Sequence, residues 1–474
     1  MPRSMRVLTG ALAVLAVAVP TSPAAAQQVR VEAETFQLPN GLTVILHRDT
    51  TTPTIATNIW YHVGSSHERP GRTGFAHLFE HIMFEGSKNV PEGKIDEWFA
   101  EVGGAPNGST TTDRTNYMQS FSSNALDMAL FIESDRMGWL LDAMSPASVD
   151  GQRDVVKNER RQSYDNRPYG LASQVITEAL YPPTHPYSWP VIGYMDHLSA
   201  AAYEDVVDFF RTYYAPNNAS IAIVGDIDID EARRLATKWF AGIPRGEPVP
   251  PLAAEPPIVS SQQRLVLDDR VQLPRLYLTW VSPRAYAEDD AAMDALAQLL
   301  TGGKNSRLYQ RLVYEMQIAD DVVAFQRGMR LNGEFRIMAT ARAGHTLGEI
   351  YDVIMEELAR VQRESPEARE LERVINQNEI AFLERLERVA TKADMLNEYL
   401  FYTGDPEYFE EDLERYRALT PAAVSAAARR WLQPERSIVL SVVPAGRHEL
   451  AVPESRPVPN ENLEQSPQAR KGAA

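Results

Sequence analysis

The segment from Gly74 to Phe84 contains two histidines with the spacing of metal ligands. His77 and His81 are four residues apart, so on a helix their imidazoles project from one face, a single turn apart, and can bind one Zn²⁺ ion. Glu80 can reach a water on that metal without being a ligand, which is the placement that a general base requires. The order His-x-x-Glu-His is the inverse of the commoner zinc-protease motif. The alternative is a partly buried helix whose histidines make ordinary hydrogen bonds.

A catalytic zinc site needs a third protein ligand and leaves its fourth position to water. The chain has no cysteine, so this ligand must be a histidine or a carboxylate. A helix is predicted to begin with Ser148 as its N-cap residue and to continue through Glu159. Gln152, Val156 and Glu159 share one face of it, which the apolar Val156 marks as inward. The spacing makes Glu159 a candidate ligand, but it does not select Glu159 over other acids such as Glu101.

These segments fall in the first of two predicted domains. Six prolines between Pro244 and Pro257 disfavour both helix and sheet pairing, which predicts an exposed linker at 244–257. We therefore expect an N-terminal domain at 27–243 and a C-terminal domain at 258–452. From 453 to 474 the chain is polar and contains prolines, so we expect a flexible tail there.

The two predicted domains repeat one plan. Late in each, a proline-containing turn joins a helix-like segment to an apolar strand, at Pro216 before 219–224 and at Pro434 before 437–443. The two prolines are about half of the chain apart. This pattern predicts a duplicated α+β domain, in which each copy has one sheet with its helices.

Composition excludes some classes of function. With 474 residues, 44% of them hydrophobic, the chain is long enough for two packed domains. Its formal net charge of −17 argues against nucleic-acid binding, which needs a basic surface to neutralise phosphates.

The N-terminus predicts a secretory signal peptide. Arg3 and Arg6 precede an apolar run at 7–19, and small residues follow up to Ala26, after which we expect cleavage. The run is too short to span a bilayer as a mature anchor, although an uncleaved anchor is the alternative. We therefore expect a periplasmic or secreted protein with no membrane attachment after cleavage.

Several of these segments together resemble a known family, the M16 (pitrilysin or insulinase) metallopeptidases. In that family a Val-Val-x-x-Glu helix supplies the third zinc ligand, and 155–159 is similar to it. Another segment, Asn107-Gly108-Ser109-Thr110, is similar to the edge strand that binds substrate. The remaining segments that carry the resemblance are Gly64-Ser65, Glu68, Gly74, Ala76 to His81, Phe84-Glu85-Gly86, His185-Pro186-Tyr187, Gly302-Gly303 and Ser306-Arg307-Leu308.

The resemblance implies a fold and a mechanism. It implies two homologous α+β domains that form one half of a clam-shell chamber, and a zinc-dependent endopeptidase that cleaves unstructured peptides. His77, His81 and Glu159 would hold one Zn²⁺ ion, and Glu80 would activate its water. The strand at 107–110 would bind an extended peptide by main-chain pairing.

The chain departs from the family pattern at two places. Where the family has a second glutamate near the metal ligands, this sequence has Gln152, which can donate hydrogen bonds but carries no charge. Active members also have an arginine and a tyrosine, seven residues apart, that contact the substrate and stabilise the oxyanion. The matching positions here are Val313 and Asp320, which cannot do so.

The second departure predicts a partner. We expect a heterodimer with a zinc-less paralogue that supplies the arginine and the tyrosine, and a homodimer is the alternative. The competing hypotheses of function are a non-catalytic assembly subunit and a subunit that binds peptides without cleaving them.

Overall fold

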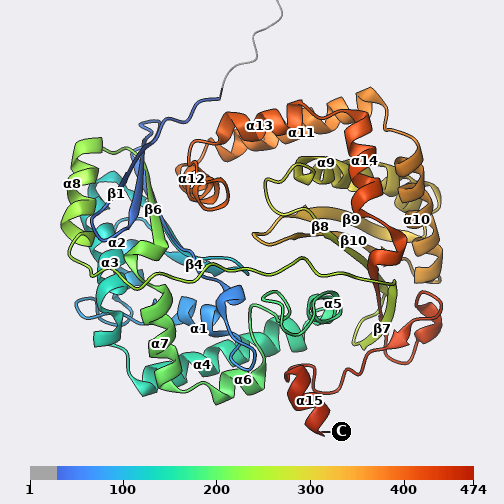
Figure 1. The fold of residues 1–474 in the computed structure, drawn as a ribbon, viewed down its shortest axis with the longest axis horizontal. Helices are drawn as coiled ribbons and strands as arrows, with labels where there is room; N and C mark the ends of the chain where they lie inside the picture. Colours follow the sequence, from blue (N-terminus) through green and yellow to red (C-terminus); the bar gives the residue numbers. More distant parts are fainter. Residues whose placement is uncertain (1–28, 474) are drawn as a thin grey trace, which may run out of the picture.

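The computed structural model describes residues 29–473, so the predicted signal peptide at 1–26 lies outside the described residues. The described chain forms two six-stranded sheets with helices packed on them (Figure 1). This arrangement confirms the predicted fold class of two sheet-plus-helix domains. Within residues 29–473, no helix is both long enough and apolar enough to cross a membrane.

The two sheets have the same strand pattern. The strand order is β1-β2-β6-β3-β5-β4 in the first sheet and β12-β7-β11-β8-β10-β9 in the second. The first sheet consists of β1 (Glu34–Gln37), β2 (Thr43–Arg48), β3 (Thr54–Tyr61), β4 (Asn107–Thr110), β5 (Thr115–Ser122) and β6 (Ala219–Gly225). The second consists of β7 (Gln263–Asp269), β8 (Arg275–Ser282), β9 (Ala319–Arg327), β10 (Gly333–Ala341), β11 (Ser437–Pro444) and β12 (Arg456–Pro457).

Pairing directions support the predicted duplication. β2 pairs with β6 in parallel, β7 pairs with β11 in parallel, and the next three pairs of each sheet are antiparallel. The two proline turns also correspond, because Pro216–Asn218 and Pro434–Arg436 are short 3₁₀ turns that lead directly into β6 and β11. The outermost strands differ: β1 precedes the first copy along the chain, and β12 follows the second.

Helices connect the strands in both copies. Those before the second sheet are α1 (Phe75–Ile82), α2 (Lys94–Glu101), α3 (Leu126–Trp139), α4 (Pro146–Arg160), α5 (Ala172–Leu180), α6 (Met195–Ala200), α7 (Tyr203–Tyr213) and α8 (Ile229–Phe240). Those that follow are α9 (Asp290–Thr301), α10 (Leu347–Arg363), α11 (Ala368–Arg385), α12 (Val389–Thr403), α13 (Phe409–Arg417), α14 (Pro421–Trp431) and α15 (Pro467–Ala473).

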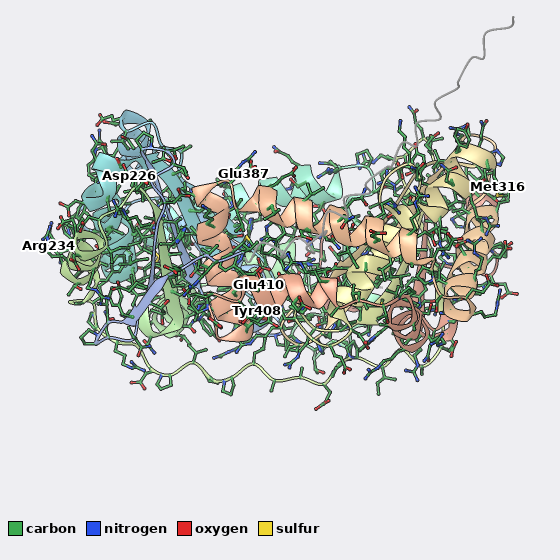
Figure 2. All side chains as sticks on the ribbon, turned by 90° about the horizontal axis from the view of Figure 1, so that it is seen from above. Asp226, Arg234, Met316, Glu387, Tyr408 and Glu410 are labelled. Carbon is green, nitrogen blue, oxygen red and sulfur yellow. The ribbon has the colours of Figure 1, made fainter. Side chains whose placement is uncertain are left out.

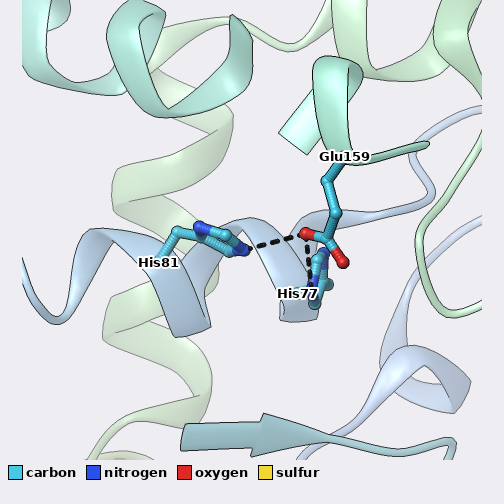
Figure 3. A group of neighbouring side chains, drawn as sticks. All are labelled: His77, His81 and Glu159. Atoms are coloured by element: carbon cyan, nitrogen blue, oxygen red, sulfur yellow. Dashed lines mark ion pairs between the residues drawn. The ribbon is translucent and has the colours of Figure 1, made fainter. Parts of the chain in front are cut away.

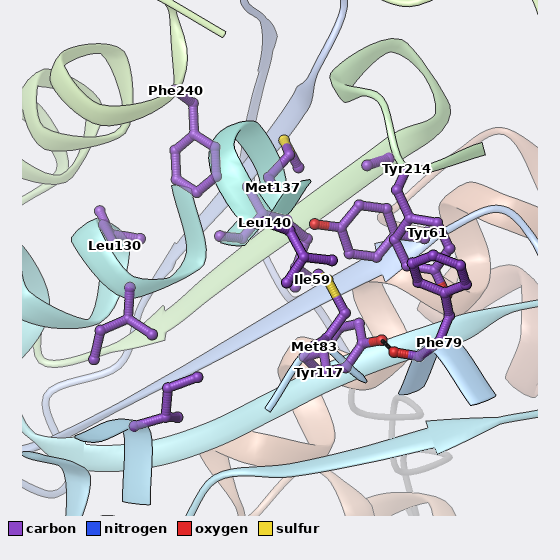
Figure 4. Close-up of a cluster of buried hydrophobic side chains, with 14 of the residues drawn as sticks. Ile59, Tyr61, Phe79, Met83, Tyr117, Leu130, Met137, Leu140, Tyr214 and Phe240 are labelled. Atoms are coloured by element: carbon purple, nitrogen blue, oxygen red, sulfur yellow. Dashed lines mark hydrogen bonds between the residues drawn. The ribbon is translucent and has the colours of Figure 1, made fainter. Parts of the chain in front are cut away.

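α1 packs on one face of the first sheet, and their side chains form one hydrophobic core. Ile59 and Tyr61 of β3 and Tyr117 of β5 are fully buried against Phe79 of α1 (Figure 4). Tyr117 also donates a hydrogen bond of 3.3 Å from its hydroxyl to the carbonyl oxygen of Phe79. Buried aromatic side chains stabilise such a contact strongly, so α1 is held rigidly against the sheet.

The two halves exchange a helix. α12, from the second half, packs on the first sheet, where Leu396 contributes to one core with Ile45 and Val224 (Figure 1). α5, from the first half, packs on the second sheet, where Ile176 contributes to one core with Leu440. Each copy therefore has one sheet face that is covered by a helix of the other copy. Both of these cores contain residues from before and from after the predicted linker at 244–257.

The segment between the halves contains neither helix nor strand from 244 to 260, and it runs across the molecule from one sheet to the other (Figure 1). A second connection lies near the start of the described chain, where the backbone N–H of Val29 donates to Glu410 at 3.0 Å. In the view from above, Glu410 and Tyr408 lie between the two halves (Figure 2).

The C-terminal segment differs from our expectation of a flexible tail at 453–474. β12 pairs with β7, and Leu463 is buried. Ser466 donates to Asp196 of α6 from its backbone N–H at 2.8 Å and from its hydroxyl at 2.5 Å. The expectation was wrong because the partners of this polar segment, β7 in the second half and Asp196 in the first, lie far away in the sequence.

Candidate metal centre

α1 presents both histidines on one side. Phe75, Leu78, Phe79 and Ile82 are buried in the core, so the turn between His77 and His81 faces away from the sheet. The hydrophobic stripe of the helix thus determines which way the imidazoles point. Figure 3 shows the two rings directed toward the side chain of Glu159.

The N-terminus of α1 is fixed by Glu68. Its carboxylate accepts the backbone N–H groups of Gly74, at 3.0 Å, and Ala76, at 2.9 Å, which are among the amides that a helix leaves unpaired. Burial raises the pKa of Glu68 to about 8, although these hydrogen bonds oppose the rise. Gly74 has φ of 90°, and a Cβ there would lie 2.8 Å from the carbonyl oxygen of Ile192. The family resemblance included Glu68, but no local pattern around it indicates this capping role.

α4 brings Glu159 to the histidines from its last turn. The helix begins at Pro146 rather than at the position that we predicted. Ser145 is the N-cap residue and accepts the backbone N–H of Ser148, whose own hydroxyl accepts the backbone N–H of Ser145. Pro146 suits the first helical position, because a missing N–H costs nothing there. The expectation that Ser148 is the N-cap residue was therefore wrong by three residues.

The structure brings His77, His81 and Glu159 together. One ligand atom from each lies within 4.8 Å of the others. Glu159 Oε2 is 3.6 Å from His77 Nε2 and 3.3 Å from His81 Nε2 (Figure 3). Glu159 is 78 residues beyond His81 in the sequence, so only the packing of α4 on α1 makes this contact.

The protonation of these groups suits a metal site. Burial lowers the pKa of His77 to about 4, and this leaves the imidazole neutral at pH 7. The hydrogen bond from His81 lowers the pKa of Glu159, which favours its ionised form. A neutral imidazole and an ionised carboxylate are the protonation states in which His77 and Glu159 would bind zinc. Glu159 keeps 38% of its side-chain surface exposed, so the group is open on one side.

Glu80 lies beside these three side chains and contacts the edge strand of the first sheet. Thr110 of β4 donates its hydroxyl hydrogen to Glu80 Oε2 at 2.5 Å. Burial raises the pKa of Glu80, and the hydrogen bond from Thr110 lowers it in part. A carboxylate with a raised pKa is a stronger base, so the position of Glu80 is suitable for proton transfer.

Among the described residues, β4 is the last strand of its sheet and has one unpaired edge. Its four residues, Asn107, Gly108, Ser109 and Thr110, are exposed or half-buried. Gly108 faces Glu80 closely, because a Cβ there would lie 3.0 Å from Glu80 Cγ. Arg114 supports the strand from the adjacent turn by donating to the carbonyl oxygen of Ser109 at 2.9 Å.

The hairpin of β4 and β5 is joined to the second half through Asp113, which sequence reasoning did not single out. Its buried carboxylate accepts the hydroxyl of Tyr187 at 2.6 Å and the backbone N–H of Arg330 at 2.9 Å. Since Asp113 and Arg330 are distant in the sequence, no spacing pattern could reveal this connection.

The three residues at which the sequence departs from the family pattern do not belong to the group of His77, His81 and Glu159. Gln152 donates its amide to Glu85 at 2.6 Å, so its contact is with the residue that follows the α1 segment. Val313 packs against the core of the second half, and Asp320 pairs with Arg342 at 3.1 Å. Neither Val313 nor Asp320 lines the cavity beside Glu80.

That cavity has a volume of about 720 Å³ and lies between the two sheets. His77, Glu80 and Glu159 line one side, together with Gly108, Ser109 and Thr110 of β4. Other lining residues come from β8, β9 and β10 of the second sheet and from the segment before α5. The candidate metal centre therefore opens into a space that is large enough for several residues of an extended peptide.

Comparison with protein families gives two matches in succession. Residues 43–185 match the model of insulinase (peptidase family M16), and residues 200–378 match that of the peptidase M16 inactive domain. A zinc protease of Helicobacter pylori, PqqE, is 30% identical over 373 residues, which are 77% of this chain and 83% of the relative.

Solved structures have the same fold. A crystal structure of a protease from Helicobacter pylori superposes with a TM-score of 0.83 and 26% identity, covering 88% of this chain and all of the other. The periplasmic protease PqqL from Escherichia coli superposes with a TM-score of 0.75 and 20% identity. This second match covers 92% of the present chain but only 50% of PqqL, so the chain corresponds to about half of the longer protein.

Proposed function

Since the chain belongs to the M16 family of peptidases, we propose that it is a zinc-dependent endopeptidase that cleaves unstructured peptides or small unfolded proteins. The observation that carries this proposal is the convergence of His77, His81 and Glu159 beside Glu80 and the free edge of β4.

The three side chains fit a zinc ion. Ligands at 2.0–2.1 Å from a tetrahedral ion are separated by about 3.3 Å from one another. The distances from Glu159 to His81 and to His77, 3.3 and 3.6 Å, are close to this separation. When bound, zinc supplies a Lewis acid that polarises the scissile carbonyl and makes water more acidic.

Glu80 acts as the general base in this proposal. Its carboxylate takes the proton of the attacking water and later delivers it to the leaving amine. The raised pKa of Glu80 strengthens it as a base, and the hydrogen bond from Thr110 holds the carboxylate toward the cavity. This division of roles leaves Glu159 and the histidines as ligands.

The substrate binds to β4 as an additional antiparallel or parallel strand. Main-chain pairing with residues 107–110 tolerates many sequences but requires an extended backbone, which selects unfolded substrates. Gly108 supports this role, because the absence of a side chain there leaves room between the strand and Glu80.

The site is completed by a partner subunit in our proposal. Val313 and Asp320 stand where active members have an arginine and a tyrosine, and neither lines the cavity. We therefore propose a heterodimer with a zinc-less paralogue that supplies these two side chains, with a homodimer as the alternative. The match to only half of PqqL supports an assembly of two such chains. We place the complex in the periplasm on account of the N-terminal sequence at 1–26.

The test is a cleavage assay on a quenched unstructured peptide. The chain without residues 1–26, alone and together with a zinc-less paralogue, is compared with its Glu80→Gln variant. We expect about one zinc per chain in both forms, and activity only with Glu80 in place. Thr237→Val, on the outer face of α8, is the control and should retain full activity.

A second candidate is a subunit that assembles with other M16 chains or binds peptides without cleaving them. The residues at 313 and 320 favour it, because they cannot stabilise an oxyanion. If the complex that carries Glu80→Gln processes the peptide as fast as the complex with Glu80, this candidate is supported and the proposed mechanism is contradicted. Strong activity of the isolated chain would refute only the need for a partner.

A further inference from the structure

The cavity beside the candidate metal centre has a basic wall, although the whole chain carries a net charge of −17. Arg275 of β8, Arg327 of β9 and Arg336 of β10 all line it, and so does Arg167. Outside the metal centre, the carboxylate that lines the same space in the described chain is Glu334. We name Arg275, Arg327 and Arg336 the arginine wall.

Strand alternation directs these side chains into the cavity. On β10, Phe335 and Ile337 point into the core beneath the helices of the second half, so Arg336 between them points to the opposite face. On β8, Leu276 belongs to the same core, and Arg275 therefore lies on the cavity face. The fold thus places arginines at positions that face the cavity.

Internal partners satisfy only part of the arginine wall. Arg336 pairs with Glu334 at 3.1 Å and donates to the hydroxyl of Ser173 at 3.0 Å, and within residues 29–473 no partner is found for its buried Nε. Arg275 donates to the hydroxyl of Thr340 at 2.9 Å and stacks 3.9 Å from the ring centre of Tyr169. Arg327 is exposed, and no ion pair is found for it within residues 29–473. Donors of Arg275 and Arg327 therefore remain available to an anionic group, whereas Arg336 is buried and contributes its positive charge.

The wall and the metal centre face the same bound peptide. Tyr164 also lines this cavity: burial raises its pKa, the charge of Glu159 raises it further, and Arg327 lowers it. Both charges therefore act on one phenol. A peptide paired with β4 and extending past Tyr164 would reach the guanidinium groups.

We propose that the arginine wall binds carboxylate groups of the substrate, so that the chain prefers peptides with aspartate or glutamate side chains or with a free C-terminal carboxylate near the cleaved bond. This inference rests on the proposed function for the position of the peptide. Guanidinium groups bind carboxylates through paired, charge-assisted hydrogen bonds. The acidic outer charge of the protein does not oppose it, because the local wall determines the field inside a cavity.

The test measures binding rather than turnover. The mature chain with Glu80→Gln is titrated into fluorescein-labelled unstructured decapeptides, and the dissociation constant is obtained from anisotropy at low salt. One peptide carries three glutamates, and its match carries three glutamines. Each is made with a free and with an amidated C-terminus, which separates the side-chain carboxylates from the terminal carboxylate.

We expect the glutamate peptide, or the free-acid form, to bind about fivefold to tenfold more tightly than its uncharged match, and added salt should reduce this difference. The double variant Arg275→Gln, Arg327→Gln should lose most of the preference but keep its binding to the glutamine peptide. Arg211→Gln, an exposed arginine of α7, is the matched control and should keep the preference.

Equal binding of charged and uncharged peptides would overturn the proposal, as would a preference that survives in the double variant. Absence of saturable binding by any of the four peptides would also overturn it. The proposed peptidase fails separately, if the complex with native Glu80 binds the peptides but does not cleave them. Circular dichroism of the double variant excludes a loss of fold as the cause of weaker binding.

Discussion

Thr110 of the edge strand donates a 2.5 Å hydrogen bond to Glu80 of α1. This hydrogen bond connects two parts of the proposed site. Thr110 belongs to the strand that we expect to bind the peptide, and Glu80 is the carboxylate that we expect to act as the base. Displacement of β4 would move Glu80, and loss of the hydroxyl would free the carboxylate to turn away from the cavity.

Removal of this hydroxyl should reduce catalysis without removing the metal. For Thr110→Val we expect kcat/KM to fall by about 10-fold to 100-fold, since a hydrogen bond to a charged group contributes about 1.5–3 kcal/mol. Zinc content should stay unchanged, because Thr110 does not contact the three ligand atoms. Thr110→Ser keeps the hydroxyl and should recover most of the activity. Full activity of the valine variant would show that Glu80 needs no support from β4.

Loss of the third ligand should abolish zinc retention. In Glu159→Gln a neutral amide replaces the carboxylate, so we expect zinc affinity to fall by more than about 100-fold. Metal analysis after dialysis measures the effect, and circular dichroism checks the fold. Glu101→Gln is the matched control, because Glu101 is exposed at the end of α2 and should not affect zinc. Retention of one zinc per chain by Glu159→Gln would contradict the ligand set.

The sequence was informative where local patterns specify the structure. The spacing of His77 and His81 predicted a shared helix face, and the prolines at 216 and 434 predicted corresponding strands in two copies. These features depend on residues that are close together in the sequence. These local features are the reason that the fold class could be predicted correctly from the sequence.

Contacts between segments that are distant in the sequence could not be predicted from local patterns. The apolar faces of α5 and α12 predict burial, but nothing in them indicates that each helix covers the sheet of the other half. The segment after 453 has few apolar residues, and several of its contacts are made by backbone groups, which every sequence has. The arginine wall likewise depends on strand alternation in three strands that are joined only by the fold.

Acidification should weaken the contact between Asp49, after β2, and Lys392 of α12. Burial alone would raise the pKa of Asp49, but the hydrogen bond from Lys392 and those from Thr51 outweigh it and lower the pKa to about 2. A depressed pKa stabilises the fold above the unfolded value of 3.8, and this contribution is lost as the pH falls toward 2.

Urea unfolding of wild type and Asp49→Asn measures this contribution. At pH 6 we expect the variant to be less stable by about 2 kcal/mol, and the difference should shrink between pH 4 and about pH 2. Asp127→Asn removes the exposed pair with Lys238 and should cost less than about 1 kcal/mol. A difference between Asp49→Asn and wild type that does not change with pH would mean that the amide disturbs packing rather than charge.

Deletion of residues 458–474 should loosen the end of α4 that carries Glu159. The adjacent Arg160 is completely buried and donates to the carbonyl oxygens of Gly193, at 2.6 Å, and Leu463, at 3.3 Å. Gln174 of α5 donates to the same oxygen of Leu463 at 2.7 Å. Without Leu463, two buried donors lose an acceptor, and each such loss costs about 1–3 kcal/mol.

We therefore expect the deletion to lower the Tm by about 5 °C and to weaken zinc binding, because Arg160 no longer fixes the last turn of α4. Calorimetry and competition with a zinc chelator measure the two effects. Arg470→Gln removes only the ion pair with Glu178 and leaves Leu463 in place, so its Tm should change by less than about 2 °C. If the deletion lowers the Tm but leaves zinc affinity unchanged, the C-terminal segment stabilises the contact between the halves without positioning Glu159.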